Sequence, residues 1–199
     1  MFKINDILYK VKKPYQYIGS EYSCYNKDFD LQKVKLVLAF PDKYEIGISN
    51  LGQKILYDRV NSYEGFLADR VYAPETDYRE LLIENNLNLQ SLETRHVLSD
   101  FDLIGFSLQY ELAYPTVLEM LRLGNIEVCS RDRKEGSPIV IAGGPSCFNP
   151  KTMEDFIDLF LIGDGEELIL ELMKKYKDLK ESGAARKEII KELSNTEGI

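Results

Sequence analysis

The amino-acid sequence predicts an α/β domain in which helices flank a doubly wound, mainly parallel sheet of five strands. Five short apolar runs are typical of strands buried on both faces, and the segments between them carry apolar residues at helical spacing. The pattern changes from strand to helix four times in the same sense, which favours parallel strands joined by right-handed crossovers. A chain of 199 residues suffices for one such domain with short appendages.

The apolar runs are bounded by residues that interrupt strands. The first run ends at Pro41, the second at Pro74 and the fourth at a glycine pair. Proline has no amide hydrogen to donate to a sheet, and glycine favours a change of chain direction. The predicted strands are VKLVLAF (34–40), DRVYAP (69–74), DLIGFSLQ (102–109), SPIVIAGG (137–144) and FIDLFLIGDG (156–165).

Helical periodicity appears between these runs and is longest after the last one. Apolar residues three and four positions apart form one stripe of a helix, which packs against the sheet. The stripes predict four helices, marked by Ile55, Leu56 and Val60, by Tyr78, Leu81 and Leu82, by Tyr114, Val117, Leu118 and Leu121, and by Leu168, Ile169, Leu172, Met173, Tyr176 and Leu179. Residues 86–100 show no such period and are predicted to form a short edge strand or a loop.

Three segments are expected along the chain. Residues 1–33 are polar and rich in Tyr and Lys, which predicts an irregular lead-in that packs on the domain, and residues 34–180 contain the α/β pattern. Residues 181–199 carry a further helical stripe at Ile189, Ile190 and Leu193 and end without an obvious stop signal, so we expect a C-terminal helix or linker in a longer protein.

Charge and cysteine content disfavour several classes of protein. Asp and Glu number 33 against 25 Lys and Arg, and the resulting net charge of −8 repels nucleic acid and anionic lipid. No apolar run approaches the ~18 residues of a membrane span, and the N-terminus lacks a secretory leader. The three cysteines lack CxxC spacing and are predicted to be reduced. These features predict a cytoplasmic protein that binds neither nucleic acid nor membranes.

Ligands of open parallel sheets bind beyond the carboxyl ends of the strands, where the strand order reverses. The loops at that edge are rich in glycine and small polar residues, which leave the backbone accessible to a planar ligand. The candidate ligand-binding residues are Ser49 and Gly52 after the first strand, Ser107 and Gln109 after the third, Gly143, Gly144 and Pro145 after the fourth, and Gly163, Asp164 and Gly165 after the fifth.

Each of these loops also has a purely structural interpretation. Ser49 or Asn50 is suited to cap the following helix, and Gln109 to satisfy loop amides. A glycine pair is commonly a tight turn, and Asp164 with an acidic residue three positions later resembles a capping box. No GxGxxG or GxxxxGK[ST] pattern follows the first strand, so the two common phosphate-binding loops are absent.

The sequence offers little for catalysis by this chain alone. Its single histidine, His96, lies outside any metal-binding or catalytic spacing, and the cysteines do not form a CxxxCxxC motif. A histidine-rich metal site and a Ser-His-Asp triad are therefore excluded. We expect neither a catalytic residue nor a metal ligand in this chain.

Four segments together resemble the N-terminal cobalamin-binding-like domain of a bacterial family of radical S-adenosylmethionine proteins. The likeness runs from about Tyr17 to Leu179, and FSLQYEL is its most specific part. The segments are FPDKYEIGISNLGQKILY (40–57), IGFSLQYELAY (104–114), IAGGPSCFNP (141–150) and DFIDLFLIGDGEE (155–167). The resemblance implies a Rossmann-like or flavodoxin-like fold.

The resemblance also implies positions for a corrin. In cobalamin-binding domains the ligand is touched by an Asp-x-His-x-x-Gly loop, a Ser-x-Leu element and a Gly-Gly pair. The matching positions are Gly52, Ser107, Gly143 and Gly144. The departures are Gly47 and Ser49, where the loop's Asp and His would stand, and Gln109 in place of the Leu. The resemblance thus implies either a corrin bound without a ligating histidine or a pocket that has lost its cofactor.

The resemblance further implies a catalytic domain downstream of this chain. In such proteins a partial TIM barrel carries CxxxCxxC cysteines that hold an iron–sulfur cluster, and the cluster cleaves S-adenosylmethionine. This chain would then be an accessory domain and that barrel its partner. The alternative is an interaction module that docks on the barrel with no small ligand, favoured by the missing histidine and the aromatic residues of the lead-in. A flavodoxin-like flavin binder is weaker because no Ser/Thr-rich phosphate loop follows the first strand.

Overall fold

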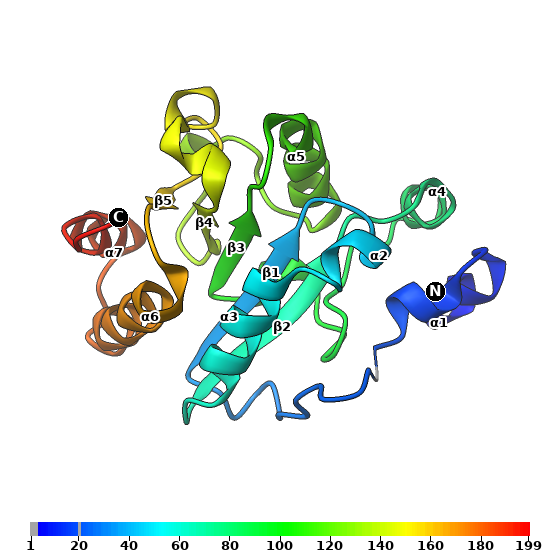
Figure 1. The fold of residues 1–199 in the computed structure, drawn as a ribbon, viewed down its shortest axis with the longest axis horizontal. Coiled ribbons are helices and arrows are strands. Elements are labelled where there is room, and N and C mark those ends of the chain that lie inside the picture. Colours follow the sequence, from blue (N-terminus) through cyan, green and yellow to red (C-terminus); the bar gives the residue numbers. More distant parts are fainter. Residues whose placement is uncertain (1–3, 20) are drawn as a thin grey trace.

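A five-stranded sheet with all strands parallel forms the centre of the molecule and confirms the predicted fold class (Figure 1). The computed structural model describes residues 4–19 and 21–199. The strand order is β2-β1-β3-β4-β5, so the order reverses between β1 and β3. The strands are β1 (Val34–Phe40), β2 (Phe66–Tyr72), β3 (Leu103–Ser107), β4 (Ile139–Gly143) and β5 (Leu159–Leu161).

The helices lie where the stripes predict them, with short helical turns in the loops. The α-helices are α1 (Ile4–Ile7), α2 (Tyr44–Gly47), α3 (Leu51–Asn61), α4 (Thr76–Glu84), α5 (Tyr114–Leu123), α6 (Gly165–Glu181) and α7 (Arg186–Ser194). The 3₁₀ helices are η1 (Leu8–Lys10), η2 (Pro14–Tyr17), η3 (Leu98–Asp100), η4 (Glu111–Ala113), η5 (Ser130–Asp132), η6 (Pro145–Phe148) and η7 (Pro150–Thr152). The second strand begins three residues earlier than predicted, because Phe66 and Leu67 pair with the start of β1.

Apolar side chains of the sheet alternate between two cores. One core lies under α4 and α5 and includes Val37, Ile104 and Val140. The other lies under α3, α6 and α7 and includes Leu36 and Ile141. Successive residues of a strand point to opposite faces, so the strands that read as continuous apolar runs serve both cores. Helices therefore cover both faces, as a doubly wound fold requires.

The outer edge of β2 is closed by polar side chains of the lead-in and of residues 86–100. Arg70 donates to Glu93 from Nε at 2.8 Å and to Glu21 from Nη2 at 2.8 Å. The buried carboxylate of Asp69 accepts from the amide and the hydroxyl of Thr94. Residues 86–100 form a loop with one isolated bridge between Gln90 and Val97 rather than a strand. An edge strand covered in this way is not available for pairing with another chain.

The last helix packs on the domain through a buried cluster of charges. Asp158 accepts from Arg133 Nη1 at 2.8 Å, from Arg186 Nη2 at 2.7 Å and from the Val140 amide at 2.8 Å. Arg186 opens α7, and Leu193 of the same helix is fully buried. The boundaries at 33/34 and 180/181 stay predictions.

Replacing Asp158 with Ala is expected to lower the free energy of unfolding by about 3–5 kcal/mol, because two buried guanidinium groups lose their counter-charge. Glu154→Ala is the control, since the ion pair of Glu154 with Lys151 is exposed and such pairs contribute at most ~1 kcal/mol. Urea unfolding monitored by circular dichroism measures both variants. A loss below about 1 kcal/mol for Asp158→Ala would contradict the assigned role.

Candidate functional site

A cavity of about 200 Å³ opens at the carboxyl end of the sheet, between α3 and α6. Helix α3 packs on β1 and β2, and α6, which follows β5, packs against α3 and β1 on the same face (Figure 1). Residues at the starts of both helices line the cavity. Leu56 of α3 lies near Gly165 of α6 at the side of this space, where a Cβ on Gly165 would be 3.4 Å from Leu56 Cδ2. This is the edge at which parallel α/β domains bind ligands.

The floor of the cavity consists of small residues on two adjacent strands. Gly105 pairs with Leu38 on one side and with Ile141 on the other, and two positions further along, Ser107 pairs with Gly143. These residues point to the same face, because side chains alternate along a strand. A large side chain at Gly105, Ser107 or Gly143 would fill the gap between the helices, so their small size creates the cavity.

The walls add polar groups from the starts of the two helices. Asn50 caps α3, since its Oδ1 accepts from the Gln53 amide at 2.9 Å. The buried side chain of Gln53 donates from Nε2 to the Leu38 carbonyl at 3.1 Å. Among the described residues that line the cavity, Glu166 is the one charged side chain. The lining is therefore apolar on the strands, polar and uncharged at the start of α3, and acidic at the start of α6.

Seven of the ten predicted binding residues line this cavity, namely Gly52, Ser107, Gln109, Gly143, Gly144, Gly163 and Gly165. The structure thus brings four separate loops to one place, and ligand binding by these residues stays a prediction. The other three are exposed and do not line the cavity. Ser49 donates its hydroxyl to the Ile46 carbonyl at 2.9 Å, Pro145 opens η6 and Asp164 precedes α6.

The structural interpretations of the loops have different outcomes. Of the two candidate caps of α3, Asn50 forms the capping bond. Asp164 stands at the N-cap of α6, but its side chain makes no capping hydrogen bond, so the capping-box interpretation is wrong. The helix begins next to Asp164, as predicted. The exposed carboxylate of Asp164, however, accepts no hydrogen bond from the first backbone amides of α6.

The two glycines after β4 are required for different reasons. Gly144 has φ +111°, and a Cβ there would lie 2.7 Å from the carbonyl oxygen of Leu108. That carbonyl also accepts from the Ser146 amide at 3.1 Å, so the chain cannot move away. A Cβ on Gly143 would meet its nearest atom, the Leu161 carbonyl oxygen, at 3.7 Å. Gly144 is a tight turn, whereas Gly143 leaves open space in the cavity.

The loop after β1 has no room for a larger side chain at Gly47, the position matched to the Asp of the cobalamin-binding loop. An added Cβ at this position would lie 2.4 Å from the ring of Tyr72, which packs directly on the glycine. The single histidine stacks on Phe29 with ring centroids 3.6 Å apart and does not line the cavity. Burial raises the pKa of the Cys147 thiol to about 11, so this thiol stays protonated at neutral pH. No three potential metal ligands gather among the described residues.

Of the lining residues outside the predicted set, Asn50, Gln53 and Glu166 add polar groups and Gly105 adds bare main chain. A signal existed for Gly105, because a glycine inside an otherwise apolar strand often marks the close approach of a ligand or another backbone. No sequence signal distinguishes Gln53, whose position depends on the angle at which α3 crosses the sheet.

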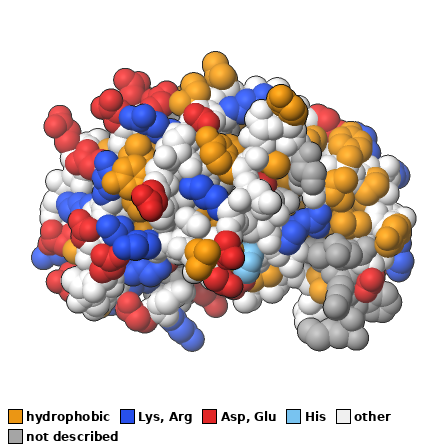
Figure 2. Space-filling view, turned by 90° about the horizontal axis from the view of Figure 1, so that it is seen from below, with side chains coloured by type: hydrophobic (Ala, Val, Ile, Leu, Met, Phe, Trp, Pro, Cys, Tyr) orange, Lys and Arg blue, Asp and Glu red, His pale blue; other side chains and the backbone are white. Residues whose placement is uncertain are grey.

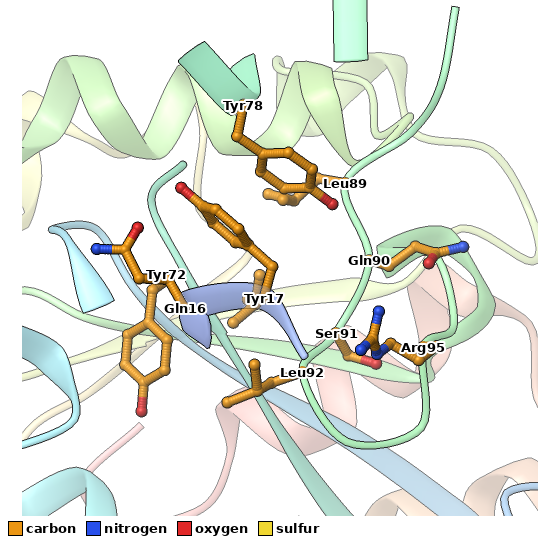
Figure 3. A pocket seen from close by; sticks show the side chains of 10 residues that line it. Gln16, Tyr17, Tyr72, Tyr78, Leu89, Gln90, Ser91, Leu92 and Arg95 are labelled. Carbon is orange, nitrogen blue, oxygen red and sulfur yellow. The ribbon is translucent and has the colours of Figure 1, made fainter. Parts of the chain in front are cut away.

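A second, smaller cavity lies where the lead-in covers β2. Figure 3 shows Tyr17 of η2 beside Tyr78 of α4, and their rings stack with centroids 4.0 Å apart. The cavity measures about 20 Å³, which is room for about one water molecule. This space reflects the packing of the lead-in rather than a ligand site.

The strand order and the cavity at the order reversal define a flavodoxin-like α/β domain with its site at the carboxyl edge. Residues 52–199 match the family model described as radical SAM proteins, N-terminal, and the chain belongs to this family. The resemblance drawn from the sequence is thereby confirmed for the radical SAM family, while its cobalamin-binding character stays a prediction. A search of curated proteins found no match. Within the described part of the chain, no helix is both long and apolar enough to cross a membrane.

The glycine pair provides a matched test of the site geometry. Gly144→Ala is expected to lower the free energy of unfolding by about 1–3 kcal/mol, because Ala must adopt a positive φ against the Leu108 backbone. Gly143→Ala is expected to cause no loss, since its methyl group enters open space and Ala loses less entropy in a strand. Urea unfolding of the two variants measures the difference. Equal destabilisation of both variants would contradict an open cavity at Gly143.

Proposed function

We propose that this chain is the accessory N-terminal domain of a radical S-adenosylmethionine iron–sulfur enzyme and that its cavity binds the nucleotide arm of a corrin. The observation that carries this proposal is the bare floor formed by Gly105, Ser107 and Gly143. An open space above the middle of a sheet is unfavourable for a domain without a ligand, because apolar atoms there lack packing partners. A bound group that fills the space restores those contacts.

The dimensions of the site support binding of one arm of a large ligand. Pockets for whole ligands usually measure about 300–1,000 Å³, whereas this cavity measures about 200 Å³. A planar ring bound by its arm would lie across the loops outside the cavity. Gly144 and Gly163 present main chain without side chains there, and both are exposed. A corrin thus fits with its arm inside and its ring on the edge.

The polar residues of the site suit a ligand that carries amide groups. The Ser107 hydroxyl and the Gln109 amide are placed to hydrogen-bond such groups, and Glu166 would accept from their N–H donors. The described lining contains no lysine or arginine to bind a terminal phosphate, which disfavours a flavin nucleotide. Ser49 stands at the position of the ligating histidine, and its exposed hydroxyl bonds the Ile46 carbonyl outside the cavity, which supports a corrin held without a protein histidine on the cobalt.

A catalytic partner domain follows from the family, and we infer its chemistry from the resemblance. The iron–sulfur cluster and S-adenosylmethionine would belong to that domain, and this chain would position a cofactor against it. The net charge of −8 supports a domain that binds neither nucleic acid nor anionic membranes. We further propose that the enzyme is cytoplasmic.

A second candidate function is a module that docks on the catalytic domain and binds no small ligand. The observation in its favour is a group of exposed apolar side chains around the cavity, of which Leu112 is 88% exposed. Ligand titration separates the two functions, because a docking module without ligand would show no response to any corrin.

Titration with hydroxocobalamin tests the proposal. A ligand present at about 100 times its Kd stabilises the folded state by about 2.7 kcal/mol, so the melting temperature is expected to rise. Gly105→Val is expected to weaken binding by at least about tenfold, because its side chain fills the floor of the cavity. Ser49→Ala is the control, since Ser49 lies outside the cavity.

Two results would overturn the proposal. One is an unchanged melting temperature and visible spectrum at ~100 µM hydroxocobalamin, a concentration at which a micromolar ligand gives a clear shift. The other is equal binding of cobinamide, which lacks the nucleotide arm, since the cavity would then not hold that arm.

A further inference from the structure

We propose that the exposed apolar side chains around the cavity form the docking surface for the catalytic domain of the same protein. We call this surface the carboxyl rim; it consists of Ile46, Leu51, Tyr110, Leu112 and Phe148. Leu112 is 88% exposed, Phe148 74% and Leu51 69%. Single exposed apolar residues are normal, but a group of them at one edge marks an interaction site. The inference rests on the accessory-domain part of the proposed function and does not require a corrin.

The rim residues come from three loops that the sheet brings to the same edge. Ile46 and Leu51 follow β1, Leu112 follows β3 and Phe148 follows β4. Their neighbours Asn50, Gln109 and Gly144 line the cavity. The rim therefore adjoins the cavity on the side of the loops after β1, β3 and β4, and a domain seated on it would lie beside the opening.

Contacts between the loops hold the rim in place. The Tyr110 hydroxyl hydrogen-bonds the Asp42 carboxylate, which joins the loops after β1 and β3 and raises the pKa of Tyr110. Two backbone hydrogen bonds join the loops after β3 and β4. The Leu108 amide donates to the Gly143 carbonyl at 2.8 Å, and the Ser146 amide donates to the Leu108 carbonyl at 3.1 Å. A surface fixed in this way loses little entropy when a partner binds.

The side of the amino ends carries both charged and apolar groups. Strands β1 and β3 point upward in Figure 1, so Figure 2, seen from below, shows that side. Lysine, arginine and acidic side chains are interspersed there, and apolar side chains gather toward the right-hand end of the view. The carboxyl rim is chosen as the docking surface because its residues lie in the loops that line the cavity.

The choice of the catalytic domain as occupant follows from the family and from one hydrogen bond. The family consists of N-terminal domains of radical SAM proteins, so the partner domain belongs to the same protein. The Ile162 amide, just after β5, donates to the Gly198 carbonyl at 2.7 Å. Residues 196–199 therefore lie at the carboxyl edge, and a covalently attached partner would be tethered beside the rim at a high effective concentration.

Hydrogen–deuterium exchange of the full-length radical SAM protein tests the docking. Amides of residues 108–114 and 146–149 are expected to exchange at least about tenfold more slowly in the full-length protein than in the 199-residue chain. The double variant Leu112→Asp with Phe148→Asp is expected to remove this protection, because two carboxylates would be buried at the interface. Leu31→Asp is the matched control, since Leu31 is 76% exposed and precedes β1 at the other end of the sheet.

The outcomes separate docking from ligand binding. Protection that appears without corrin and is lost in the double variant alone supports the proposal. Protection that needs added hydroxocobalamin would overturn it and support the ligand instead. Rim protection already present in the 199-residue chain and dependent on its concentration would overturn it in favour of a second copy of this chain. Equal exchange in both proteins would overturn it, whether or not a corrin binds.

Discussion

The central constraint of this structure is the small size of neighbouring residues on one face of β3 and β4. Gly105, Ser107 and Gly143 lie where side chains of ordinary size would fill the space between α3 and α6. Elsewhere on the same face, leucine and isoleucine side chains pack against the helices. Because protein interiors are close-packed, an unfilled space at the carboxyl edge is a specific feature of this sequence rather than loose packing. The position of the cavity, its apolar floor and the ring of loops around it all follow from these positions.

Two clusters of buried charged side chains, one at each edge strand of the sheet, hold the elements around the cavity in place. At the β2 edge Arg70 is bound by Glu21 and Glu93, and near β5 Asp158 is bound by Arg133 and Arg186. Burying a charge is favourable only when its partners are correctly placed, so each cluster holds distant segments in one arrangement. The first cluster orders the lead-in and the loop before β3, and the second orders the last helix. Loops at the carboxyl edge thus project from a rigid base, as binding sites on α/β domains usually do.

The fold could be predicted from the sequence because the spacing of apolar residues follows one period, that of a strand or that of a helix, in each segment. The place of the site could be predicted because parallel strands have all their carboxyl ends at one edge of the sheet. That rule alone predicted that Gly52, Ser107, Gly143 and Gly163 would come together. Gly105 carried a signal, a glycine inside an apolar strand, but its place in the floor depends on the register that sets it between Leu38 and Ile141. Gly144 was explained only in three dimensions, by the Leu108 backbone 2.7 Å from an added Cβ. Asp164 shows the limit of motif reasoning: a suitable spacing places a residue at a helix start without making its side chain form the bond.

The contact between Gly47 and Tyr72 fixes the loop after β1 next to the cavity. Tyr72 ends the edge strand β2, and its ring occupies the space that a side chain at position 47 would need. The loop after β1 is therefore packed against the sheet, with Ser49 exposed to solvent and Asn50 at the cavity. The described lining offers a ligand main chain, apolar side chains, neutral polar groups and one carboxylate, Glu166. Such contacts provide shape selectivity without altering the electronic state of a metal, which leaves reactivity to groups outside this domain. Under the proposed function, these groups would hold the ligand in place and the chemistry would come from the partner domain.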